Sequence, residues 1–183
     1  SMRRTWRAAG PGRLRVLMLA LALLAGCSLN PPLELDTIAP AATPVRLSSV
    51  PFFAQTGFQC GPAALAGVLG AAGVATDPAT LAPQVYLPAR QGSLQLELVA
   101  ATRRAGRLPY VLAGEPRALL AELQAGRPVL VLQNLGTPQV PVWHYAVLTG
   151  FDAAPNRLYL NSGSERDLPV RAPQFLRTWE WAG

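Results

Sequence analysis

The chain has 183 residues, half of them hydrophobic and 14% charged, with a formal net charge of +6. The charge is uneven, because five of the 16 basic residues and none of the ten acidic ones precede Cys27. The remainder carries 11 basic and 10 acidic side chains, a net charge of +1. This balance lacks the electrostatic footprint of nucleic-acid binding, and we expect no nucleic-acid partner.

Residues 1–26 have the pattern of a secretory signal peptide. Ser1 stands ahead of Met2 and is interpreted as a remnant of cloning. Five arginines precede or lead into an apolar run of 10 residues, 16–25. A membrane-spanning helix needs about 20 apolar residues, so the run is too short to span a bilayer and suits an export signal.

The signal peptide ends at a tetrapeptide that resembles the bacterial lipobox, Leu24-Ala25-Gly26-Cys27. The resemblance implies cleavage before Cys27 and a diacylglycerol on its sulfur; an ordinary signal peptide with a chance cysteine is the alternative. Ser28 follows, where an aspartate would retain a lipoprotein in the inner membrane. We therefore expect a lipid-anchored envelope protein, in the outer membrane and facing the periplasm.

Two further segments follow the signal peptide. Residues 27–47 begin with the lipidated cysteine and are rich in proline, alanine and threonine without periodicity, which predicts a flexible, extended tether. Residues 48–183 are enough for one ordinary domain and too few for two comfortable ones.

The first half of this domain has helical patterns. A buried helix is predicted from its alanine-rich, apolar composition, with a proline in its first turn and a glycine at its end. Ser93 is the expected cap of a later helix. The predicted helices are residues 60–73, a short helix opened by Asp77-Pro78, residues 93–106 and residues 115–125.

The second half has strand patterns. Runs of β-branched and apolar residues predict strands at residues 129–133, 143–151 and 157–161, with a hairpin loop at 152–156. Helices followed by antiparallel strands favour an α+β fold with segregated layers. The apolar and aromatic segment 175–181 should pack onto the domain. Whether a further strand should follow, and whether the C-terminus is shortened, stay open.

Cys60 is the chain's unpaired thiol if Cys27 is lipidated. An unpaired thiol in an oxidising compartment is either reactive or an inert core residue. Cys60 falls in the first turn of the predicted helix 60–73, where free N–H groups and the helix dipole stabilise a thiolate. This position favours a nucleophile.

His144 is the chain's single histidine, and it lies in the predicted strand 143–151. A lone histidine is by default structural, but a thiolate nucleophile needs a base that titrates near neutral pH. We therefore pair it with Cys60. One histidine and one cysteine fall short of a zinc ligand set, so we expect no metal and no cofactor.

These residues resemble the C39-like cysteine peptidases, which have a papain-like fold and are best known for cutting leader peptides after double glycine. The motifs that carry the resemblance are PFFAQTGFQCGPAAL at residues 51–65, WHYAV at 143–147, GFD at 150–152 and GSL at 92–94. It covers roughly residues 48–165 and is closest to predicted lipoprotein peptidases of Gram-negative bacteria. It implies that the helix of Cys60 packs on a C-terminal antiparallel sheet.

The resemblance also implies two helper residues. A glutamine upstream of the cysteine donates into the oxyanion hole; Gln55 fits best, one residue closer than usual, and Gln59 is the alternative. A third residue after the histidine orients the imidazole. Asn161 occupies that place where many C39 enzymes have aspartate, giving the Cys-His-Asn set of papain. Asp152 is the alternative.

The implied function is hydrolysis of a polypeptide substrate through an acyl-enzyme on Cys60. Three alternatives remain: an inactive peptide-binding module of an envelope or secretion assembly, a thiol acyltransferase resembling phytochelatin synthase, and a structural tether. Envelope or secretion machinery is the expected partner beside the lipid anchor.

Overall fold

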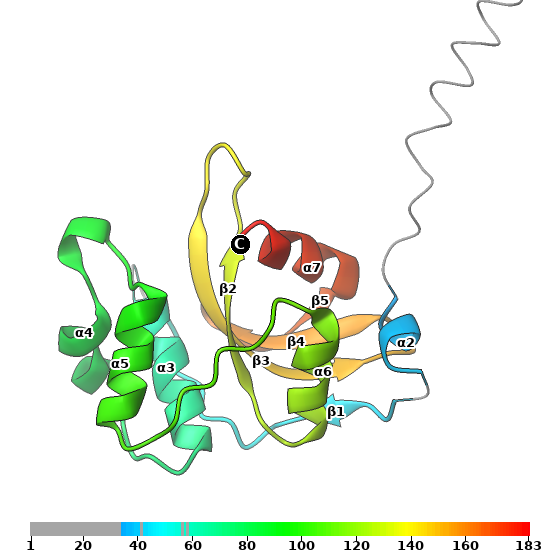
Figure 1. Ribbon diagram of the computed structural model, residues 1–183, viewed down its shortest axis with the longest axis horizontal. Coiled ribbons are helices and arrows are strands. Elements are labelled where there is room, and N and C mark those ends of the chain that lie inside the picture. Colours follow the sequence, from blue (N-terminus) through cyan, green and yellow to red (C-terminus); the bar gives the residue numbers. More distant parts are fainter. Residues whose placement is uncertain (1–33, 41, 56, 58) are drawn as a thin grey trace, which may run out of the picture. The chain divides into compact units, whose positions relative to one another are not determined.

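The computed structural model describes residues 34–183, except residues 41, 56 and 58. The expected signal peptide and Cys27 lie outside the described residues. The elements occur in this order (Figure 1): α2 Leu35–Ile38, β1 Val45–Arg46, α3 Cys60–Ala71, α4 Pro78–Val85, the 3-10 turn η2 Pro88–Arg90, α5 Gln95–Arg104, α6 Pro116–Gln124, β2 Val129–Asn134, β3 Trp143–Asp152, β4 Arg157–Ser162, β5 Glu165–Arg171 and α7 Ala172–Glu180.

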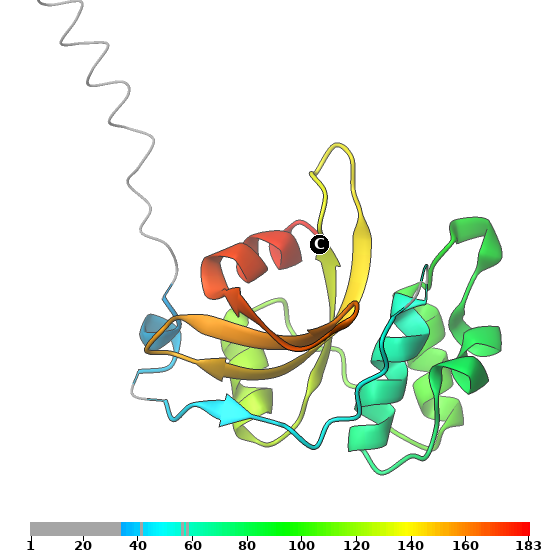
Figure 2. The ribbon, with the colours of Figure 1, turned by 180° about the vertical axis from the view of Figure 1, so that it is seen from behind.

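Within the described residues, five strands form one antiparallel sheet with β3 at its centre. One edge of β3 pairs with β4, which in turn pairs with β5. The other edge pairs with β2 along residues 143–148 and with β1 at residues 150 and 151. The β2–β3 hairpin projects beyond the rest of the sheet (Figures 1 and 2).

Strand β3 joins two hydrophobic cores, because successive side chains of a strand point to opposite faces. Tyr145 and Val147 join a core that contains residues of α3, α4 and α5. Ala146 and Leu148 join a second core that contains residues of α6 and α7. The structure therefore confirms the predicted α+β class, with the helix of Cys60 packed on an antiparallel sheet.

Glycines on α3 allow the loop before Cys60 to lie against the helix that follows it. A Cβ added at Gly70 would stand 2.7 Å from Pro51 Cγ, and one at Gly67 would stand 3.0 Å from the Pro51 carbonyl oxygen. Both approaches are too close for a larger residue without movement. The segment that leads to Gln55 is thus held beside α3.

The predicted helices and strands are confirmed, with small shifts at their ends, but the Ser93 cap is wrong. Helix α5 begins at Gln95, and its N-cap residue Leu94 makes no side-chain cap. Asp77 does cap α4, since its Oδ1 accepts from the Thr80 N–H at 2.8 Å.

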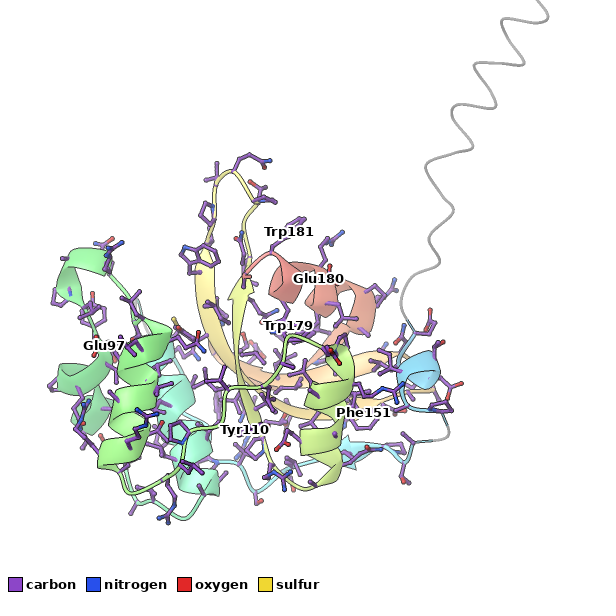
Figure 3. All side chains as sticks on the ribbon, in the orientation of Figure 1. Glu97, Tyr110, Phe151, Trp179, Glu180 and Trp181 are labelled. Atoms are coloured by element: carbon purple, nitrogen blue, oxygen red, sulfur yellow. The ribbon has the colours of Figure 1, made fainter. Side chains whose placement is uncertain are left out.

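The C-terminal segment forms strand β5 and helix α7, neither of which the sequence patterns specified. Phe175 and Leu176 are buried against the sheet, so the expected packing of this segment occurs through a helix. The Gln133 amide of β2 donates to Thr178 Oγ1 of α7 at 2.7 Å. Figure 3 shows Trp179 and Trp181 at this end of the molecule, beside β2.

The described part of the expected tether packs onto the domain. Leu35 is only 1% exposed and belongs to the core shared with α6 and α7. Its backbone N–H donates to Asn156 Oδ1 in the β3–β4 loop at 3.0 Å. The prediction of a flexible, extended tether at residues 27–47 is therefore wrong for α2, because Leu35 is buried in the hydrophobic core of the domain. None of the helices in the described ranges is long and apolar enough to cross a membrane.

Candidate active site

Cys60 is the first residue of α3, with Gln59 as the N-cap residue. The thiol is free and half-buried, and it packs against the core that contains Tyr145. The first turn of a helix has N–H groups without intrahelical partners and the positive end of the helix dipole. Cys60 thus occupies the first-turn position that the sequence predicted for it.

Ser93 lies against Gly61, the residue after Cys60. A Cβ added at Gly61 would collide with Ser93 Oγ and stand 2.6 Å from Ser93 Cβ, so the glycine after Cys60 is required for this contact. Ser93 Oγ is buried and has no hydrogen-bond partner among the described residues. Its contact with α3 explains why this serine does not cap α5. The helix-cap pattern could not reveal this contact between distant segments.

Gln55 is held at the start of the sheet. Its backbone N–H donates to the Gly163 carbonyl at 2.9 Å, and its Nε2 donates to the Tyr145 carbonyl at 3.4 Å. Gln55 Oε1 is buried without a partner among the described residues. Gln59 is instead exposed. Of the two candidate glutamines, Gln55 thus has the fixed side chain, anchored one residue from His144.

His144 is the second residue of β3, and its ring is half-buried. Its Nε2 lies 2.8 Å from Ser162 Oγ, the last residue of β4. Within the described residues, the ring makes no hydrogen bond with the Cys60 thiol. Burial lowers the pKa of His144 below its ordinary value of 6.5, which favours the neutral ring that can accept a proton.

The structure brings Ser162, and not Asn161, to His144. Asn161 is 5% exposed, and its Oδ1 accepts from the Asp167 N–H at 3.1 Å. Neighbouring residues of a strand point to opposite faces, so the one-residue difference decides which side chain meets the ring. Asp152 is wrong as the alternative, since it is the last residue of β3, eight positions from His144 and about 25 Å away along an extended strand.

Tyr145 is a neighbour of Cys60 that the sequence patterns did not single out. Burial, and secondly the charge of Cys60, raise the pKa of Tyr145 to about 12. A Cβ added at Gly61 would stand 3.7 Å from Tyr145 Cδ2, so the start of β3 lies beside the start of α3. In the printed sequence, the only cue was that Tyr145 follows His144.

The surroundings of the site contain few charges. No charged residue occurs from Pro128 to Phe151, which includes all of β2 and most of β3. The hairpin carries exposed apolar side chains at Leu135, Val140, Val142 and Trp143. The described residues contain no group of three or more His, Cys, Asp or Glu side chains that could hold a metal ion.

Helix α3 begins with a cysteine and packs on an antiparallel sheet, and the second residue of the central strand β3 is a histidine. This is a papain-like arrangement. The chain belongs to the Peptidase_C39 like family, whose profile matches residues 47–183. No curated protein matches the sequence.

Three solved structures have a similar fold. A protein of Bacillus anthracis described as a C39-like peptidase has a TM-score of 0.63 and 19% identity, covering 78% of this chain and 94% of its own. A double glycine motif protease from an AMS/PCAT transporter, solved with the leader peptide, has a TM-score of 0.58 and 24% identity. The match covers 75% of this chain and 92% of that protease. The peptidase domain of Streptococcus ComA has a TM-score of 0.56 and 21% identity. The match covers 71% of this chain and 92% of that domain. These similarities confirm the papain-like C39 fold.

The lowered pKa of His144 predicts a loss of stability as the pH falls below about 6.5. Between that value and the lower pKa of the folded state, the unfolded chain binds the proton first, which favours unfolding. Urea unfolding at pH 7.5 and pH 5.5 measures the effect. His144→Gln should lose less stability than the wild type over this interval. An equal loss in both proteins would contradict the prediction.

Proposed function

We propose that this chain is an exported, lipid-anchored cysteine peptidase with Cys60 as nucleophile and His144 as general acid and base. The observation that carries the proposal is the position of Cys60 at the start of α3, packed against the core that contains Tyr145, whose carbonyl accepts from Gln55 Nε2. This arrangement offers a free thiol at the start of a helix and a side-chain amide donor, in a member of a peptidase family.

The proposed reaction is acyl transfer to water. The Cys60 thiolate attacks a peptide carbonyl, while Gln55 Nε2 and the Cys60 backbone N–H stabilise the oxyanion. His144 gives its proton to the leaving amine, and the C–N bond breaks to leave a thioester. His144 then takes a proton from water, and the hydroxide attacks the thioester and releases the acid and the Cys60 thiolate, which restores the thiolate–imidazolium pair.

The proposed substrate is a polypeptide. Support comes from the apolar, uncharged hairpin that leads into His144, since Val142 and Trp143 are exposed next to the base. Apolar side chains of an extended peptide could bind there without paying for desolvated charges. A further support is that one protein of similar fold was solved in complex with its leader peptide.

The product distribution tests this function. The full chain is incubated with a mixture of unrelated peptides, with and without glutathione, and the products are identified by mass spectrometry. New termini formed by hydrolysis support a peptidase. Glutathione or amine adducts in place of hydrolysis would show an acyltransferase. Unchanged peptides together with a slow Cys60 alkylation, no faster than that of glutathione, would overturn catalysis.

A peptide-binding module without hydrolysis is the second candidate. The observation that favours it is the His144 ring, which hydrogen-bonds Ser162 and not the Cys60 thiol. Catalytic hydrogen bonds are often long in structures without substrate, so this geometry does not by itself prevent catalysis. Tight binding of a peptide that is recovered intact would identify this function.

The proposed anchor is Cys27, within the lipobox-like sequence that ends the signal peptide. Ser28 supports the outer membrane as the destination. Metabolic labelling with a fatty acid in a Gram-negative host, followed by membrane separation, tests both points. Cys27→Ser should abolish labelling, and a labelled variant would exclude lipidation at this residue.

A further inference from the structure

The inference begins with the hydrogen bond between His144 Nε2 and Ser162 Oγ, at 2.8 Å. This distance is short enough for a well-formed bond between a ring nitrogen and a hydroxyl. Ser162 ends β4 and is half-buried, as is His144. A hydroxyl that hydrogen-bonds one ring nitrogen restricts the rotation of the ring. It also favours one of the two neutral tautomers of the imidazole.

Asn161 has a separate structural role, and the hydrogen bond to the His144 ring is made by Ser162. The Asn161 Oδ1 accepts from the Asp167 N–H, and Asp167 has a φ of 51°, in the left-handed region. Thr149 Oγ1 also donates to Asp167 Oδ1 at 3.1 Å. The pairing of β4 with β5 shifts register between residues 160 and 162. Asn161 thus stabilises the strained backbone of this irregular pairing.

We infer that Ser162 is the positioning residue of His144: its Oγ accepts the Nε2 proton, which leaves the Nδ1 lone pair free for the proton of the Cys60 thiol. The role rests on the proposed peptidase function. Ser162 touches neither the thiol nor the substrate in this scheme, and it acts through the histidine. It replaces the carboxylate or carboxamide that the sequence resemblance had led us to expect at Asn161.

A hydroxyl orients the ring without adding a negative charge. The elements around His144 offer few charges, because β2 opposes it with Gln133 and α7 approaches that glutamine with Thr178. The charged group paired with Ser162 is the exposed Glu165 of β5. Cys60 is the titratable group at the start of α3. The imidazolium therefore receives less stabilisation than it would from a buried aspartate.

The test observes the imidazole directly, since the chain has one histidine. Nitrogen NMR of the full chain, labelled at His144, distinguishes the two neutral tautomers and follows the titration of the ring. The wild type should show the Nε2–H tautomer. Ser162→Ala should give a mixture of tautomers, and Ser162→Thr should restore the wild-type signal. Asn161→Ala is the matched control and should leave the tautomer unchanged.

Activity provides the second measurement. Ser162→Ala should lower kcat by about 10- to 100-fold and leave KM within about twofold, because the substrate does not contact the hydroxyl. An unchanged tautomer in Ser162→Ala, or an altered one in Asn161→Ala alone, would overturn the inference. The NMR result is independent of hydrolysis. A tautomer change in a chain that cuts no peptide would support the positioning role and refute the proposed peptidase.

Discussion

Cys60→Ser is expected to lower the rate of peptide hydrolysis by about 10⁴-fold or more. A serine hydroxyl ionises far less readily than a thiol, so the start of α3 can stabilise a thiolate but not an alkoxide. The rate is measured with the best peptide found in the product screen. Cys27→Ser provides the matched control, since it makes the same change at the other cysteine of the chain.

The Cys60→Ser protein should remain folded, because the side chain is only half-buried and the replacement is similar in size. A thermal unfolding curve close to that of the wild type checks this point. Hydrolysis that survives in Cys60→Ser but disappears in Cys27→Ser would place the nucleophile elsewhere and refute the proposal.

His144→Gln is expected to lower kcat/KM by about 10³-fold or more, since no other histidine can supply the proton transfers. Glutamine preserves a polar side chain on β3 but does not titrate. The variant should also react more slowly with iodoacetamide at neutral pH.

Alkylation is quantified at Cys60 by mass spectrometry, with glutathione as the reference thiol. Trp143→Phe is the control for this strand, because it changes the exposed neighbour of His144 and keeps the histidine. An unchanged alkylation rate in His144→Gln at neutral pH would show that the imidazole does not activate the thiol. Helix α3 alone would then account for its reactivity.

The sequence patterns located most elements because their local chemistry is strong. Alanine and leucine define α3, the cap at Asp77 defines α4, and β-branched runs define β2 and β3. Strand β5 was missed because the residues 165–171 alternate weakly and include Pro169. Helix α7 was missed because the segment considered, 175–181, leaves out Ala172, which completes the helical i, i+3, i+4 spacing of the buried residues Ala172, Phe175 and Leu176.

The site was predictable where it depends on local structure and less so where it depends on pairing between strands. The position of Cys60 at the start of a helix follows from the sequence around it. The partner of His144 depends instead on which face of β4 each residue occupies, and that register comes from tertiary packing. Asn161 and Ser162 differ by one position, so sequence spacing alone could not choose between them.

The absence of charged side chains from Pro128 to Phe151 has a consequence for how a substrate reaches the site. Charged clefts gather oppositely charged ligands from a distance, and dissolved salt weakens that attraction. The uncharged hairpin beside His144 provides no such long-range electrostatic attraction. Capture on this side of the protein would depend on short-range contact with Val140, Val142 and Trp143. Changes in the ionic strength around the cell would therefore have little influence on the encounter.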